Sequence, residues 1–176
     1  MYPYMLQDRM RLSAAYIKGE EGMKEANALK NIEWQEFFIA CGQVGHRYFE
    51  MEDYENAMIH FRESVDVIER FMIPGKEGYD AYPIGGTHAN HAITLQQIAA
   101  CMFRLGRTEE IDTLIEKAKH IYFDAFNHIE LRDYSKTMTE MLEYFAEQYN
   151  KLKLNGYKPL DLREIEKRVA EHGKNT

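Results

Sequence analysis

The sequence predicts an all-α protein, and three observations lead to that prediction. Apolar residues recur at steps of three and four along most of the chain, and no stretch alternates with period two for long enough to indicate a sheet. Only four prolines occur in 176 residues, and none of them interrupts a helical pattern. Hydrophobic residues make up 45% of the chain and charged residues 29%, which is typical of a folded protein rather than a disordered one.

Length and charge limit the domain organisation and the classes of partner. A chain of 176 residues can bury a core in one domain and is short for two, so we expect a single domain over residues 1–176. The 22 Lys and Arg residues are outnumbered by 29 Asp and Glu residues, which gives a net charge of −7. This balance disfavours nucleic-acid binding and anionic-membrane binding, because both need a basic surface.

Three further features predict a cytoplasmic protein. Residues 1–9 resemble neither a signal peptide nor the start of a membrane span. No apolar run approaches the ~20 residues that a membrane-spanning helix needs. Cys41 and Cys101 lie in apolar helical stretches and are not spaced as a metal-binding pair, so we expect buried, reduced thiols.

Four helices are expected before residue 73. Helical spacing of apolar residues predicts a helix over 4–18 and, after Gly19 and Gly22, a short one to about residue 30. A long run of apolar residues predicts a third helix over 32–51. Asp53 is expected to cap a fourth helix that ends near residue 72, because its carboxylate can accept hydrogen bonds from the free N–H groups of a helix start.

After a break over 74–86, four more helices are expected. Thr87 is a predicted cap for a fifth helix, which should stop at Gly106 because glycine readily adopts the left-handed conformation common after helix ends. Thr108 is expected to cap a sixth helix of over twenty residues, to about residue 130. A seventh is expected from residue 133, and a final charged helix after residues 159–161 should end near residue 173. The short connections at residues 52, 106 and 132 imply antiparallel neighbours.

Two of the predicted helix pairs share a spacing of small and large residues. The first pair reads Cys41-x2-Val44-Gly45-x2-Tyr48, then Asp53-Tyr54, then Ala57-x3-Phe61-x2-Ser64. The second reads Leu95-x2-Ile98-Ala99-x2-Met102, then Gly106, then Ile111-x3-Ile115-x2-Ala118. Over residues 38–72 and 92–121 this pattern resembles the tetratricopeptide repeat, although Glu69 and Phe123 stand where that family has proline.

The resemblance implies an α-solenoid, an array of antiparallel helix hairpins with seven to eight helices in all. In such an array Gly45 and Ala57 are small where the two helices of a pair touch, and Tyr48 and Phe61 are large where they fill the gap to the neighbouring pair. An unrelated helical bundle is the alternative, because small and large residues alternate in any closely packed pair of helices.

The resemblance also implies a place for a partner, because the first helix of each pair lines the concave face of the array. The matching positions are Ile39, Gly42, His46, Phe49 and Glu50 in one repeat, and Ile93, Gln96, Ala100, Phe103 and Arg104 in the other. Apolar and polar residues with two aromatic anchors are typical of a peptide groove, and the alternative is that both Phe residues pack under neighbouring helices. Gly42 and His46 stand where related chaperone adaptors carry carboxylate-clamping residues, so a chaperone tail is not the expected partner.

The break over 74–86 is expected to be an ordered loop that shapes the binding site. Its prolines and glycines exclude a helix, yet it holds Tyr79, Tyr82 and Ile84, and disordered linkers rarely keep three large apolar groups so close together. Tyr79 and Tyr82 are therefore candidate partner-binding residues. A loop that merely covers exposed core is the alternative.

Two groups of residues resemble catalytic or ligand sites only weakly. His120 and His128 share one stripe of a predicted helix, but eight residues of helix span about 12 Å, which is too far for one metal ion to contact both. The run over 85–87 is a glycine-rich helix start of the kind that binds anions, but the lysine of a phosphate-binding loop does not follow it. We therefore expect neither catalysis nor a metal.

The sequence thus predicts a non-catalytic module, without a cofactor, that binds a protein or peptide of unknown identity. Two alternatives stay open. One is a structural homo-oligomer, such as a homodimer. The other is a bundle with a small-molecule, phosphate or metal site lined by histidines, with the candidates His46, His88, His91, His120 and His128.

Overall fold

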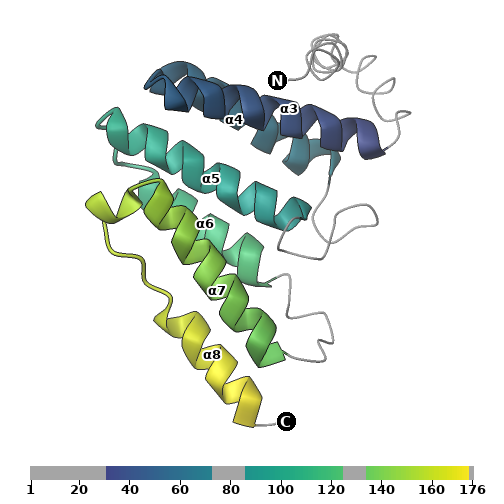
Figure 1. Ribbon diagram of the computed structural model, residues 1–176, viewed down its shortest axis with the longest axis vertical. Helices are drawn as coiled ribbons and strands as arrows, with labels where there is room; N and C mark the ends of the chain where they lie inside the picture. Colours follow the sequence, from purple (N-terminus) through teal and green to yellow (C-terminus); the bar gives the residue numbers. More distant parts are fainter. Residues whose placement is uncertain (1–30, 73–85, 125–133, 175–176) are drawn as a thin grey trace. The chain divides into compact units, whose positions relative to one another are not determined.

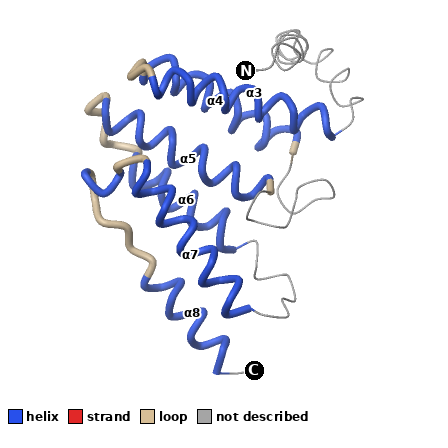
Figure 2. The backbone as a smooth tube through the Cα atoms, viewed as in Figure 1, coloured by secondary structure: helices blue, strands red, loops and turns tan. Residues whose placement is uncertain are grey.

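The structure, a computed structural model, describes residues 31–72, 86–124 and 134–174, and these are folded into helices without strands (Figures 1 and 2). The elements are α3 (Asn31–Glu50), α4 (Tyr54–Phe71), α5 (Thr87–Arg104), α6 (Ile111–Asp124), α7 (Tyr134–Lys151), the short 3₁₀ helix η2 (Leu154–Gly156) and α8 (Arg163–Lys174). The all-α prediction is confirmed. The helices expected before residue 31 lie outside the described residues, so a total of seven to eight stays a prediction.

None of the described helices is both long and apolar enough to cross a membrane. The chain divides into two compact units, Met1–Tyr79 and Asp80–Thr176. The first contains α3 and α4, and the second contains α5 to α8. We describe each unit by itself, and a single domain over residues 1–176 stays a prediction.

α3 and α4 form an antiparallel pair in the first unit (Figure 1). The hydroxyl of Ser64 donates a hydrogen bond to the carbonyl oxygen of Phe38 at 2.9 Å. Near the other end of the pair, the ring of His60 stacks on that of Tyr48, with centroids 5.5 Å apart. Later residues of α3 therefore contact earlier residues of α4, which is the signature of an antiparallel pair.

The turn between α3 and α4 contains the predicted cap. Glu52 has a left-handed backbone with φ of 61°, and the N–H of Asp53 donates to the carbonyl oxygen of Tyr48 at 2.9 Å. The Asp53 carboxylate accepts a hydrogen bond from the backbone N–H of Asn56 at 3.3 Å. Asp53 thus caps α4 as expected, because it satisfies a backbone donor that has no partner within the helix.

The two helices of this pair approach most closely at Gly45. A Cβ atom on Gly45 would lie 2.7 Å from the ring of Phe61, so glycine leaves the room that this ring occupies. Ala57, the other expected contact position, is also fully buried. The Phe61 ring lies across Gly45 within the pair, and its expected role in filling the gap to a neighbouring pair stays a prediction. One end of the pair is closed by a core cluster of Phe37, Phe38, Cys41, Val67, Ile68 and Met72.

In the second unit, a glycine stands near each end of α5: Gly86 directly before it and Gly106 two residues after it. The prediction that Thr87 caps α5 is wrong: Gly86 holds the extended cap conformation, and Thr87 is the buried first residue of the helix. Gly106 is left-handed with φ of 71°, and the next N–H, of Arg107, donates to the carbonyl oxygen of Met102 at 2.9 Å. This closes α5 as predicted, because a residue with positive φ redirects the chain so that free carbonyls are satisfied.

α6 begins at Ile111, three residues after the predicted cap Thr108, and the described part ends at Asp124. The expected continuation to about residue 130 lies outside the described residues. α6 packs on α7 through four aromatic side chains whose ring centroids are 4.9–6.5 Å apart: Tyr122, Phe123, Tyr144 and Phe145. This aromatic cluster is the core between the two helices.

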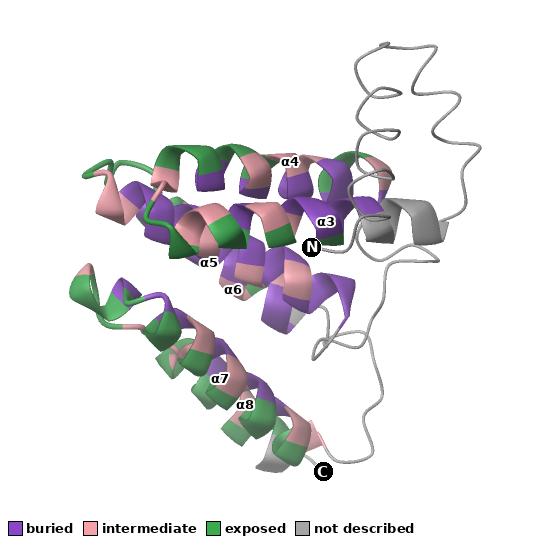
Figure 3. Ribbon diagram, turned by 45° about the horizontal axis from the view of Figure 1, so that its top comes forward, coloured by how far each residue is buried: buried purple, intermediate pink, exposed green. Residues whose placement is uncertain are grey.

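The connection from α7 to α8 is held against the unit at two points. The hydroxyl of Tyr149 donates to the carbonyl oxygen of Lys158 at 2.7 Å, and the ring of Tyr157 lies 5.7 Å from that of Phe103 in α5. α8 itself is mostly exposed and turns Ile165 inward (Figure 3). It is the charged final helix that the sequence predicts, and it begins at Arg163.

Candidate functional site

The partner-binding positions predicted on α3 lie on an accessible side of that helix. Ile39 is 39% exposed, and the side chains of His46 and Glu50 are 57% and 49% exposed. A Cβ atom on Gly42 would meet no atom of the described residues within 4 Å. The strip of Ile39, Gly42, His46 and Glu50, here called the α3 strip, follows helical spacing and therefore forms one continuous surface. Its middle is open at Gly42.

The polar end of the α3 strip is arranged by short-range ion pairs. Glu50 Oε2 accepts a hydrogen bond from Arg47 Nη1 at 3.1 Å, and Glu50 Oε1 lies 3.3 Å from His46 Nε2, so a neighbour approaches each of its two oxygens. Phe49, the predicted aromatic anchor, is half-buried, and its ring meets the edge of Tyr54 at 5.3 Å. The strip therefore offers an apolar end at Ile39 and a charged end at Glu50, with an aromatic group beside the latter.

The equivalent positions on α5 are much less accessible. Gln96 is 0% exposed, and its side-chain amide has no hydrogen-bond partner among the described residues. Phe103 is half-buried and contacts the segment after α7, where a Cβ atom on Gly156 would lie 3.5 Å from its ring. Arg104 is also half-buried and donates to the carbonyl oxygen of Ala100 at 3.3 Å. A partner role for Gln96, Phe103 and Arg104 stays a prediction, and it requires these groups to become more accessible.

Two other predicted site residues, Tyr79 and Tyr82, lie in the loop over 73–85, outside the described residues. Their role in shaping the site stays a prediction. The same holds for His128 in the predicted histidine stripe.

The remaining histidines are placed separately. His88 and His91 are buried on α5, whereas His120 is exposed on α6. Across the described ranges, no group of three or more His, Cys, Asp or Glu side chains could hold a metal ion. Both cysteines are free and buried, as expected, and burial raises the pKa of the Cys101 thiol to about 12. A thiol with so high a pKa stays protonated and is a poor nucleophile at neutral pH.

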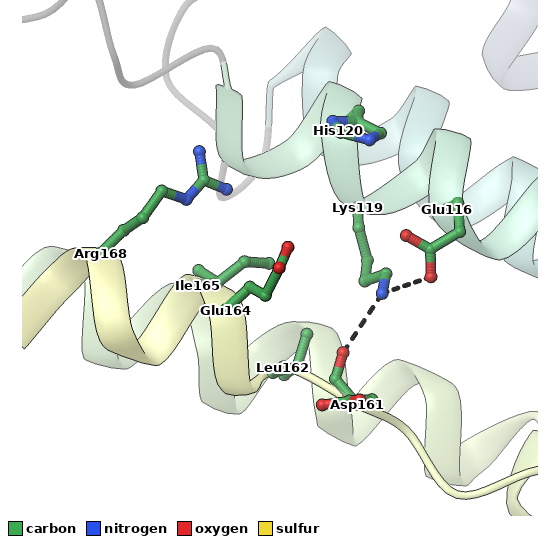
Figure 4. Close-up of a pocket in the computed structure, with 8 residues that line it drawn as sticks. All are labelled: Glu116, Lys119, His120, Asp161, Leu162, Glu164, Ile165 and Arg168. Atoms are coloured by element: carbon green, nitrogen blue, oxygen red, sulfur yellow. Dashed lines mark hydrogen bonds and ion pairs between the residues drawn. The ribbon is translucent and has the colours of Figure 1, made fainter.

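A cavity that sequence reasoning did not predict lies between α6 and α8 (Figure 4). Its volume is about 240 Å³, and α6 lines it with Glu116, Lys119 and His120. The start of α8 supplies the other lining residues, Asp161, Leu162, Glu164, Ile165 and Arg168. The sequence contains no signal for this cavity, because α6 and the start of α8 are about forty positions apart.

One side of the cavity is fixed by hydrogen bonds and ion pairs. The Lys119 ammonium lies 2.5 Å from Glu116 Oε1 and donates to the backbone carbonyl oxygen of Asp161 at 3.2 Å. The Asp161 carboxylate makes two short bonds to the guanidinium of Arg163 and also accepts the Arg163 backbone N–H at 3.1 Å. These contacts hold the pKa of Asp161 well below its usual range, chiefly through the hydrogen bonds from Arg163. They also cap the start of α8.

Comparisons of the chain with protein families, with curated proteins and with solved structures found no match.

Proposed function

We propose that this chain is a non-catalytic, tetratricopeptide-like module that binds a protein or peptide segment along α3. The observation that carries the proposal is the contrast between the two sides of that helix. One side is packed on α4 through Phe38, Cys41 and Gly45, and the side that the repeat register assigns to a partner is open at Gly42.

The open space at Gly42 favours an extended segment as the ligand. Because Gly42 has no side chain and none of the described residues lies within 4 Å of its Cβ position, a partner backbone can approach α3 closely there. Ile39 on one side gives an apolar contact, and the His46–Glu50 pair on the other gives polar ones. Binding energy in such interfaces is concentrated in a few apolar and aromatic anchors, and Ile39 and Phe49 are the candidates here.

Gly42→Leu is the sharpest test, because the leucine side chain fills the open space at Gly42 without contacting the core. Peptides would be selected from a random display library on the wild-type protein, and their Kd measured by titration. We expect Gly42→Leu to weaken binding about tenfold, equivalent to about 1.4 kcal/mol, without lowering the melting temperature. Arg62→Leu on the exposed side of α4 is the matched control, since it also adds an exposed leucine to a helix.

Two results would contradict the proposal. One is equal binding by wild type, Gly42→Leu and Arg62→Leu. The other is a wild-type dimer in light scattering that Gly42→Leu converts to a monomer, because the α3 strip would then be a contact between subunits. That second result would favour the structural homo-oligomer instead.

A further inference from the structure

The cavity between α6 and α8 is lined by three carboxylates, Glu116, Asp161 and Glu164, and they differ in whether a cation pairs with them. Of its three carboxylates, Glu116 is paired with Lys119 and Asp161 with Arg163. The Glu164 carboxylate has no hydrogen bond or ion pair with any residue in the part of the chain that the structure describes. Arg168 has an interaction of its own and lies at the opposite end of the cavity from Glu116 and Asp161 (Figure 4). The group left to attract a ligand is therefore Glu164.

The cavity already holds one ammonium group in a specific way. The Lys119 side chain is only 15% exposed, and its Nζ is held between the Glu116 carboxylate and the Asp161 carbonyl. An ammonium has three donors and no acceptor, so a carboxylate and a carbonyl are the partners it requires. Lys119 thus demonstrates that this wall of the cavity provides the groups that coordinate an ammonium.

The rest of the lining suits an aliphatic chain. Ile165 is buried and Leu162 half-buried, and both lie next to Glu164 in the cavity wall (Figure 4). Long cationic side chains pack their methylene groups on apolar surface and keep the charged end near polar groups. The volume of about 240 Å³ is smaller than the roughly 300–1,000 Å³ of sites for drug-sized ligands, so the occupant is small.

We propose that this cavity binds a primary ammonium on an aliphatic stem, with Glu164 as its ion-pair partner and Leu162 and Ile165 against the stem. The ligand chemistry is that of a lysine side chain on a partner protein or of a free alkylamine. An anion fits less well, because the two cations of the lining are already engaged, Lys119 with Glu116 and the Asp161 carbonyl and Arg168 in an interaction of its own. The inference does not depend on partner binding at α3, which lies in the other unit.

The test is a titration of the full ¹⁵N-labelled chain followed by NMR. The probes are N-acetyl-lysine methylamide, which represents a protein side chain, and butylamine and spermidine, which represent free amines. N-acetyl-norleucine methylamide, with the same stem and no charge, is the ligand control, and sodium chloride at equal ionic strength controls for salt. We expect saturable shifts in the amides of residues 116–120 and 161–168, with a Kd in the millimolar range because the ion pair is partly solvated.

Three variants locate the charge that binds the ligand. Glu164→Gln should weaken binding of the charged probes about twofold to fivefold, the range measured for solvated ion pairs. Glu166→Gln removes the same charge from the same helix outside the cavity and should leave the affinity unchanged. Lys119→Met should strengthen binding, because it frees the Glu116 carboxylate and the space that the lysine ammonium fills.

The outcomes separate the two sources and can overturn the inference. Tighter binding of the capped lysine than of butylamine and spermidine assigns the cavity to a partner side chain, and the reverse order assigns it to a free amine. The inference is wrong if Glu164→Gln binds the charged probes as tightly as wild type does, or if the norleucine control gives the same shifts. It is also wrong if no localised shift occurs up to about 50 mM ligand, well above a millimolar Kd.

Discussion

The helix pairs α3/α4 and α5/α6 follow the same spacing of residues but differ in what they expose. In the first pair, Phe61 of α4 meets Gly45 of α3. In the second pair, Ile115 of α6 is equivalent to Phe61, and Ala99 of α5 is equivalent to Gly45. All four residues are buried. Gly45 faces the large Phe61 ring, whereas the second pair has Ala99 and the smaller Ile115 at the same register positions. The comparison teaches that one spacing rule can be met by different pairs of volumes.

The outer sides of these pairs differ more than the cores do. On α3, Ile39 and His46 are accessible and Gly42 faces open space. On α5, the equivalents of Gly42 and His46 are Gln96 and Ala100, and neither has any exposed surface. Within the second unit, Phe103 is covered by Tyr157 and Gly156 from the segment after α7. Equal register does not mean equal accessibility.

Phe61→Ala should give the largest effect, a loss of about 3–5 kcal/mol in the stability of the α3/α4 unit, because it removes a fully buried ring and leaves a cavity over Gly45. Hydrogen exchange of the α3 and α4 amides across a urea titration reports on this unit. Ile115→Ala in α6 is the comparison variant. A loss of α3 and α4 protection that is larger with Ile115→Ala than with Phe61→Ala would show that the two units do not have separate cores.

The two glycines of α3 should respond in opposite directions to alanine. Gly45→Ala places a Cβ 2.7 Å from the Phe61 ring and should cost about 1–3 kcal/mol through overpacking. Gly42→Ala meets nothing and should stabilise the helix by about 0.5–1 kcal/mol, because alanine loses less backbone entropy than glycine. Melting temperatures measured side by side are sufficient. A stabilising Gly45→Ala would remove the argument that this glycine sets the approach of α3 and α4.

Phe103 and Phe49, the two predicted aromatic anchors, should differ in how much they contribute to stability and to binding. Phe103→Ala is expected to cost about 2 kcal/mol, roughly half the value of a fully buried Phe, because Phe103 ties α5 to the distant residue Tyr157. Phe49→Ala should cost less, since Phe49 is half-buried and its contact with Tyr54 joins two residues that are close in the chain. Urea unfolding gives the stability, and titration with a selected peptide gives the binding. If Phe103→Ala lost peptide binding but kept its stability, Phe103 would be a binding residue rather than a core residue.

Tyr149 gives the second unit a response to alkaline pH. Burial is the main cause that raises the pKa of Tyr149 from its ordinary 10.0 to about 12. Because the folded pKa is the higher one, the stabilising contribution is complete below pH 10 and is lost as the pH rises toward 12. Tyr149→Phe should remove part of this loss and, by deleting the bond to Lys158, cost about 1 kcal/mol at neutral pH.

The measurement for Tyr149 is hydrogen exchange of α7 amides between pH 9 and pH 11, corrected for intrinsic exchange rates. Lys136→Met, an exposed position on the same helix, serves as the control. An alkaline loss of protection that is identical in wild type and Tyr149→Phe would exclude Tyr149 as its source.

Local sequence determined the helices and several of their ends. Asp53 caps α4 and Gly106 ends α5 as predicted, because a cap depends on the side chain and backbone of only a few adjacent residues. The burial of Ala57, Cys41 and Cys101 also follows from the spacing of apolar residues. The cap of α5 was predicted one residue late because glycine and threonine both suit that position and only burial selects Thr87 for the interior.

The tertiary structure alone decided which helix faces are accessible and where a cavity forms between helices. The repeat register assigns equivalent roles to Gly42 and Gln96, yet one faces open space and the other is buried without a partner for its amide among the described residues. The cavity between α6 and α8 brings Lys119 and Glu164 to one site from different helices. Such features depend on contacts between residues far apart in the chain, and a pattern read over a few turns of helix carries no information about them.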